Sequence, residues 1–200
     1  MIYIVRHGQT DYNVESRYGG RIDIDINSKG IEQAYETKEK LRGIKFDRII
    51  SSPLTRALHT ARIITNNNPN IEIDERIIER DNGDLEGRLK TDINRELKQR
   101  NEPPIDFNDP NERRYNIENI LDFRNRIYRF LNSIIKNYNG ENILIVTHAG
   151  VGLYMRCYFE GEPPKKDYSV YKLNNGEFLR YNVPAVTKEE ENLSIVKKRR

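Results

Sequence analysis

Two arginines and two histidines stand at or just after the ends of short apolar segments, and these side chains suit chemistry on phosphate groups. Arg6 and His7 follow residues 2–5, and His148 follows residues 142–147. The planar fork of a guanidinium fits phosphate oxygens, and an imidazole nitrogen can act as a nucleophile near neutral pH. Short β-branched or aromatic segments predict buried strands. These side chains are therefore expected at the carboxyl rim of a sheet, where α/β folds bind ligands.

The second arginine, Arg56, lies in the stretch SSPLTRALHTA, and Glu79 opens the stretch ERDNGDLEGRL. If one sheet gathers all these segments, its rim holds two arginines, two histidines and a carboxylic acid. The arginines and one histidine would neutralise the phosphoryl oxygens, the other histidine would attack, and the acid would protonate the leaving oxygen. Gly8, next to His7, lets the backbone turn sharply and approach a ligand.

Strand-like and helix-like segments alternate along the chain. Strands are predicted over residues 2–5, 46–51, 71–73 and 142–147, and helices over residues 29–42, 53–64, 91–99, 117–138 and 149–159. This alternation predicts an α/β fold, a three-layer α/β/α sandwich with a mainly parallel central sheet and helices on both faces. Two further runs, residues 168–173 and 177–181, flank Asn174-Asn175-Gly176 and predict an edge hairpin near the C-terminus.

The composition excludes several classes of protein. Of the 200 residues, 36% are hydrophobic and 32% are charged, so a polar protein with one domain is expected. Neither a membrane-spanning apolar stretch nor a signal peptide is recognised. The one cysteine, Cys157, allows no intrachain disulfide and fits a reducing compartment, so a cytoplasmic location is expected.

The positive charge gathers at the end of the chain. The net charge is +3, and residues 197–200 (KKRR) contribute +4 of it, which leaves −1 for the rest. The basic tail is an alternative contact for nucleic acid or a membrane surface, but a solvated terminus is the default interpretation, so neither partner is expected. We expect a single domain over residues 1–185, with a loop and helix excursion around residues 85–115 over the site, and a charged tail over residues 186–200.

Five motifs, which together extend over most of the chain, resemble those of the histidine phosphatase superfamily, also called phosphoglycerate mutase-like. They are RHGQTDYN at residues 6–13, INSKGIEQA at residues 26–34, SPLTRALHTA at residues 52–61, ERDNGDLEG at residues 79–87 and THAGV at residues 147–151. Five motifs in the right order are far more specific than any one of them.

The resemblance implies a role for each matching residue. His7 would be the nucleophile that forms a phosphohistidine. Glu79 would be the general acid and then the base for the attacking water. The transferring phosphoryl group would be held by Arg6, Arg56 and His148.

The same resemblance implies further contacts and a substrate class. Asn13 would touch the phosphate, with Thr10 as a helper and Gly8 beside them, and neither a metal nor an organic cofactor is implied. The histidines at positions 7, 59 and 148 also lack close metal-ligand spacing. A small phosphorylated metabolite is the expected partner, and both a monomer and a homodimer are left open.

The sequence around the second histidine distinguishes two branches of the superfamily. THAGV looks more like the phosphatases, including the α-ribazole phosphatases, than like the mutases, which resemble AHGNS there. We therefore expect a phosphatase of small phosphomonoesters. A cofactor-dependent phosphoglycerate mutase and a non-catalytic phosphate-binding regulatory protein remain as alternatives.

Other charged residues near the motifs have competing interpretations. His59 matches no catalytic position and is expected to be partly buried or at the surface, while Glu86, followed by a glycine, is expected to stabilise a turn. Arg17 and Arg21 either contact substrate or lie in a solvated loop. The pair Arg113-Arg114 resembles a ligand-binding pair of the mutases, but its spacing does not match. The pocket walls are expected from residues 14–25, 85–115 and 150–165.

Overall fold

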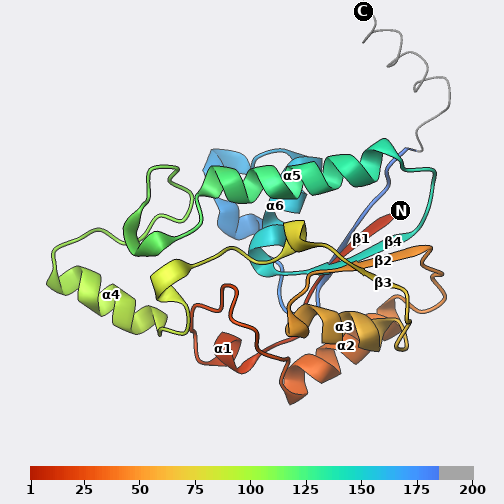
Figure 1. The fold of residues 1–200 in the computed structure, drawn as a ribbon, viewed down its shortest axis with the longest axis horizontal. Helices are drawn as coiled ribbons and strands as arrows, with labels where there is room; N and C mark the ends of the chain where they lie inside the picture. Colours follow the sequence, from red (N-terminus) through yellow and green to blue (C-terminus); the bar gives the residue numbers. More distant parts are fainter. Residues whose placement is uncertain (185–200) are drawn as a thin grey trace, which may run out of the picture.

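A computed structural model describes residues 1–184, which contain a five-stranded sheet of order β3-β2-β4-β1-β5 (Figure 1). In the middle, β1 (Ile2–Arg6) and β4 (Ile143–Thr147) run parallel, and every residue of both strands is buried. β2 (Arg48–Ser51) and β3 (Ile71–Ile73) extend the parallel sheet to one edge. β5 (Phe178–Tyr181) pairs antiparallel with β1 at the other edge. The mainly parallel sheet is thus confirmed.

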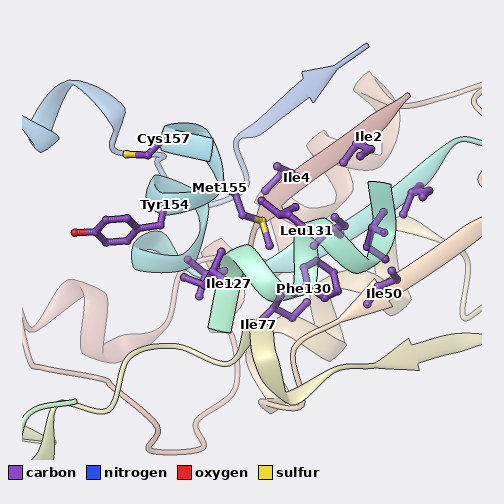
Figure 2. Close-up of a cluster of buried hydrophobic side chains, with 14 of the residues drawn as sticks. Ile2, Ile4, Ile50, Ile77, Ile127, Phe130, Leu131, Tyr154, Met155 and Cys157 are labelled. Atoms are coloured by element: carbon purple, nitrogen blue, oxygen red, sulfur yellow. The ribbon is translucent and has the colours of Figure 1, made fainter. Parts of the chain in front are cut away.

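Alternate residues of the central strands face opposite sides of the sheet, and each side has its own helices. On one side, Ile2 and Ile4 pack against α5 (Ile120–Lys136) and α6 (Ala149–Glu160) (Figure 2). The apolar residues of α5 recur every three or four positions, as in an amphipathic helix, and Figure 2 shows its Ile127, Phe130 and Leu131 pointing into this cluster.

The opposite side of the sheet carries α2 (Ser28–Lys40) and α3 (Thr55–Ile64) (Figure 1). Tyr3 and Val5 of β1 pack there against Ala57 and Ala61 of α3. Small side chains on α3 let the helix lie close to the strands. The three-layer α/β/α arrangement is therefore confirmed.

α4 (Lys90–Gln99) lies away from the sheet (Figure 1). Its buried residues Ile93 and Leu97 form a small separate cluster with Leu85 and Ile117, against which Phe107 packs. This cluster fixes the excursion around residues 85–115 to the rest of the fold. The remaining helical elements are short: α1 (Asp11–Val14), η1 (Glu75–Ile77), η2 (Gly83–Leu85), η3 (Arg114–Asn116), η4 (Pro164–Lys166) and η5 (Tyr168–Tyr171).

The predicted hairpin is wrong. Residues 177–181 contain an edge strand, β5, but its partner is β1, and Tyr168–Tyr171 form the 3-10 helix η5 instead of a strand. Asp167 starts this helix because its side chain accepts a hydrogen bond from the backbone N–H of Ser169. Tyr171 is buried in the cluster under α6. Capping and burial therefore override the strand-like pattern of this segment.

Among the described residues, no helix combines the length and the apolar character needed to cross a membrane. The predicted charged tail, residues 186–200, lies outside the described part of the chain.

Candidate active site

The carboxyl ends of β1 and β4 open onto a cavity of about 510 Å³. Arg6 and His7 reach it from the end of β1, Thr10 and Asn13 from the start of α1, and Arg56 from the first turn of α3. Glu79 lines it from the segment after η1. Three segments far apart in the sequence thus deliver these side chains to one cavity, as expected at the carboxyl rim of a parallel sheet, whereas the predicted His148 does not line it.

His7 is buried, and its hydrogen bonding defines which ring nitrogen is free. Nδ1 lies 2.7 Å from the carbonyl oxygen of Gly8. Because a carbonyl only accepts, Nδ1 carries the proton and Nε2 keeps its lone pair. Burial lowers the pKa of His7 well below its ordinary value, and the charges of Arg56 and Arg6 lower it further. His7 is therefore a neutral imidazole at physiological pH, which is the nucleophilic form.

Backbone carbonyl groups hold both arginines in place. Arg6 Nη1 donates to the carbonyl of Leu173 at 2.7 Å. Arg56 donates to the carbonyls of Ile22 and Gly20 at 2.8 and 2.7 Å. Burial lowers the pKa of each guanidinium, yet arginine stays charged in proteins. Arg6 Nε is buried and finds no hydrogen-bond partner among residues 1–184. Such an unpartnered donor fits an anionic ligand.

His148 lies behind His7, with the two ring centroids 5.2 Å apart. It is fully buried, and burial, followed by the charge of Arg56, lowers its pKa well below the ordinary value. Its Nε2 lies 2.6 Å from Ser52 Oγ. Because that hydroxyl also accepts the backbone N–H of Leu54 at 3.4 Å, it can donate its own proton to Nε2. The proton of His148 then sits on Nδ1, which has no partner within residues 1–184.

Thr10 and Asn13 form a reciprocal cap at the start of α1. The Thr10 hydroxyl accepts the backbone N–H of Asn13 at 3.3 Å, and Asn13 Oδ1 accepts the backbone N–H of Thr10 at 3.1 Å. This cap fixes the Asn13 amide at the edge of the cavity. Gly8 is placed differently from the prediction, because it does not line the cavity. A Cβ at Gly8 would lie 2.3 Å from the carbonyl oxygen of Gly30 in α2, so glycine is needed there for close packing.

Glu79 lines the same cavity as Arg6 and Arg56. Its Oε1 accepts the backbone N–H of Arg80 at 2.9 Å, and its Oε2 accepts the backbone N–H of Gly150 at 3.1 Å. Gly150 belongs to the first turn of α6, whose N–H groups have no partner within the helix. These two contacts fix the carboxyl group at the wall of the cavity.

The walls of the cavity come in part from the predicted ranges 14–25, 85–115 and 150–165, and in part from residues outside these ranges. Apolar and aromatic side chains form one side: Tyr18, Phe107, Ile120, Phe123, Leu153, Tyr154 and Tyr168. Arg80 ties the excursion to this wall by donating to the carbonyls of Phe107 and Glu118. Lys90 and Lys172 also line the cavity. Burial lowers the pKa of Lys90, and the charge of nearby Lys172 lowers it further.

The lining is strongly cationic. It contains four arginines and two lysines, against a single carboxylate, Glu79. All four arginines donate to backbone carbonyls, and Arg17 also pairs with Glu15. The other five cations have no carboxylate partner within residues 1–184 and can attract an anionic ligand. Residues 1–184 bring together no group of three or more His, Cys, Asp or Glu side chains that could hold a metal ion.

Several residues with competing interpretations lie outside the cavity lining. His59 is half-buried, within the predicted range of partly buried to surface, with Nδ1 2.9 Å from Asp25. Glu86 stabilises a turn, as predicted, since its Oε1 accepts the backbone N–H groups of Arg21 and Asn82 at 2.7 and 3.1 Å. The remaining arginines make ion pairs: Arg21 with Asp81 and Glu118, and Arg114 with Glu102 and Glu112.

The chain resembles known phosphatases and mutases in sequence and in structure. A family model described as "Histidine phosphatase superfamily (branch 1)" matches residues 2–184. The uncharacterized phosphatase PhoE of Bacillus subtilis is 34% identical over 74% of this chain and 70% of its own length. Phosphoglycerate mutase-like protein 4 of Arabidopsis thaliana is 29% identical over 88% and 80%. The crystal structure of the α-ribazole phosphatase from Shigella flexneri superposes with a TM-score of 0.71 at 27% identity, covering 88% of this chain and 87% of that one.

Proposed function

The chain belongs to the histidine phosphatase superfamily and is a phosphatase, and we propose that it hydrolyses small phosphomonoesters without a metal, through a phosphohistidine on His7. The observation that carries the proposal is the state of His7. Its Nδ1 proton is bound to a carbonyl, its pKa is lowered, and it lines the cavity with two arginines. A neutral imidazole between fixed cations is suited to attack an anionic phosphoryl group.

In the first step, His7 Nε2 attacks phosphorus and the bond from phosphorus to the ester oxygen breaks. The leaving oxygen takes a proton from the carboxylic acid of Glu79. Arg6, Arg56 and the Nδ1–H of His148 stabilise the three oxygens of the group in transit. In the second step, a water molecule gives its proton to the Glu79 carboxylate and attacks the phosphohistidine. Inorganic phosphate leaves, and His7 returns to its neutral form.

The two lysines of the cavity, Lys90 and Lys172, indicate a class of substrate. A single phosphoryl dianion is matched by Arg6 and Arg56, so Lys90 and Lys172 would remain without an anionic partner in the complex. Charge complementarity therefore favours a substrate with a second anionic group, such as a carboxylate or a second phosphate. The aromatic wall favours an organic group with an apolar face.

The first test is the release of inorganic phosphate from a panel of phosphomonoesters in the presence of a chelator. The panel contains an activated aryl phosphate, sugar phosphates, nucleotides, α-ribazole phosphate and 3-phosphoglycerate. Hydrolysis that is lost in His7→Ala but kept in His59→Ala, a half-buried histidine outside the cavity lining used as the matched control, supports the proposal. Conversion of 3-phosphoglycerate to its 2-isomer in the presence of bisphosphoglycerate, without hydrolysis, would establish the mutase alternative. Binding of phosphate without either reaction would establish the regulatory alternative.

The second test concerns the acid. Glu79→Gln keeps the size of the side chain but removes its proton donor. We expect the rate to fall strongly for an alkyl phosphate, whose leaving oxygen needs a proton, and much less for an activated aryl phosphate. Equal losses on both substrates would refute the role of Glu79.

A further inference from the structure

A residue outside all five motifs contacts the nucleophile segment and a phosphate-binding side chain together. Asn175 lies in the turn between η5 and β5. Its side-chain Nδ2 donates to the carbonyl oxygen of His7 at 3.1 Å and to Oδ1 of Asn13 at 3.0 Å. One amide group therefore connects the backbone of the nucleophile to the side chain at the edge of the cavity.

The orientation of both amide groups is fixed by backbone atoms. The carbonyl of His7 can only accept, so the group of Asn175 that faces it must be the NH2 group. The backbone N–H of Thr10 can only donate, so the atom of Asn13 that faces it must be the oxygen. The second proton of Asn175 Nδ2 therefore points to Asn13 Oδ1, which is an acceptor. With Asn13 Oδ1 occupied by two donors, the NH2 group of Asn13 is the part that remains for a ligand.

The turn that carries Asn175 is itself held against the site. The backbone N–H of Gly176 points to the carbonyls of Arg6 and His7, at 3.1 and 3.3 Å. The carbonyl of Gly176 accepts the Thr37 hydroxyl of α2 at 2.5 Å. Gly176 has a φ of +76°, and a Cβ there would lie 2.9 Å from Cβ of Gln33. The position of Asn175 is thus fixed by backbone contacts, which do not involve its own side chain.

The neighbouring residue, Asn174, closes the turn through its hydrogen bonds to Glu177. Asn174 accepts the backbone N–H of Glu177 through its carbonyl, and its side-chain Nδ2 donates to the Glu177 carboxylate at 2.9 Å. Asn174 is exposed and contacts no residue of the cavity through its side chain. The side chain of Asn175 is therefore not required to close the turn, and its two hydrogen bonds are both directed at the site.

We propose that Asn175 is a positioning residue, which orients the Asn13 amide so that its Nδ2 donates to the phosphoryl group. This inference rests on the proposed function for its catalytic consequence. Loss of one hydrogen bond to a charged group corresponds to a roughly 10- to 100-fold effect. We expect Asn175→Ala to lower kcat/KM by about this factor and to weaken the binding of inorganic phosphate.

The experiment compares Asn175→Ala with the matched control Asn174→Ala and with Asn13→Ala. Each variant is assayed for kcat and KM on an aryl phosphate, for the Kd of inorganic phosphate by calorimetry, and for Tm. We expect Asn174→Ala to bind phosphate as the unmodified protein does. The double variant Asn13→Ala/Asn175→Ala should be no worse than Asn13→Ala alone, because Asn175 acts through Asn13. Asn175→Asp should be worse than Asn175→Ala, since a carboxylate would repel both acceptor oxygens.

Two results would overturn the inference. One is equal phosphate binding by Asn174→Ala and Asn175→Ala. The other is an additive loss in the double variant, which would show that Asn175 acts independently of Asn13. A change in Tm alone would indicate a structural role only. If the unmodified protein binds phosphate but hydrolyses nothing, the proposed function fails, while the phosphate Kd values still decide whether Asn175 positions Asn13.

Discussion

The two buried histidines should make the stability of the protein depend on pH in the range where histidine titrates. Burial lowers the pKa values of His7 and His148 well below the ordinary value in the folded state. In the unfolded chain both return to about 6.5. Above that pH both states bind the same number of protons. As the pH falls below this value, the two histidines take up protons in the unfolded state but stay neutral in the folded state. The free energy of unfolding therefore decreases on acidification.

The size of the effect follows from proton linkage. Each histidine that stays neutral in the folded state contributes about 1.4 kcal/mol per pH unit below 6.5. Between pH 7.5 and 5.5 the free energy of unfolding should therefore fall by roughly 3 kcal/mol for the pair. Replacing His7 by Asn, which keeps a donor near the carbonyl of Gly8, should reduce this fall by about half. The double variant with His148→Asn should remove nearly all of it.

Urea unfolding, followed by circular dichroism in phosphate-free buffer at several pH values, measures the effect. Carboxylates with lowered pKa, such as Glu112 at about 2, lose their contribution only at lower pH. The pKa of the Met1 amino group is also lowered, but this group is the same in every variant and cancels in the comparison. An identical pH dependence in the unmodified protein and in His7→Asn would refute the conclusion that His7 is held neutral.

Three substitutions test other contacts of the site. Ser52→Ala removes the hydroxyl that places the proton of His148 on Nδ1, so kcat/KM should fall about tenfold, and the buried Nε2 left without a donor should cost about 1–3 kcal/mol of stability; an unchanged rate would refute the tautomer assignment. Gly150→Ala puts a Cβ 2.6 Å from Oε1 of Glu79, so the rate on an alkyl phosphate should fall by a larger factor than the rate on an aryl phosphate, and equal fold losses on both substrates would contradict this. Gly8→Ala brings a Cβ within 2.3 Å of the backbone of α2, and urea unfolding should show a loss of about 1–3 kcal/mol.

The central part of the fold was predictable because its signals are local. The runs that became β1 and β4 are continuously apolar, and a strand buried on both faces requires that pattern. The prediction of a strand was wrong for the segment that forms η5, and the reason is physical. Residues 168–173 contain apolar side chains suited to a strand, but Asp167 caps a helical turn and burial draws Tyr171 under α6. A contact with a distant helix leaves no periodic signal in the sequence.

In the candidate site, too, local sequence patterns were predictable and long-range contacts were not. Side chains within motifs, such as His7 and Arg56, were identifiable because their neighbours repeat a known pattern. Ser52 lies in a motif, but its contact with His148 spans 96 residues and depends on the pairing of β2 with β4. Asn175 and Lys172 carry no motif at all. Turn residues and surface lysines are common, so only the folded chain shows that these two face the cavity segments.

The position of β1 in the sheet has a consequence for how the chain acquires its activity. Ile2 pairs with Ile143 on one side and with Tyr181 on the other, so both neighbours of the nucleophile strand come from distant parts of the sequence. Contacts of such long range form slowly, because the loop entropy is lost before they stabilise anything. A chain emerging from a ribosome therefore presents the Arg6-His7 pair long before it has a pocket around it. We therefore expect phosphatase activity to appear only after both neighbours of β1 have joined the sheet.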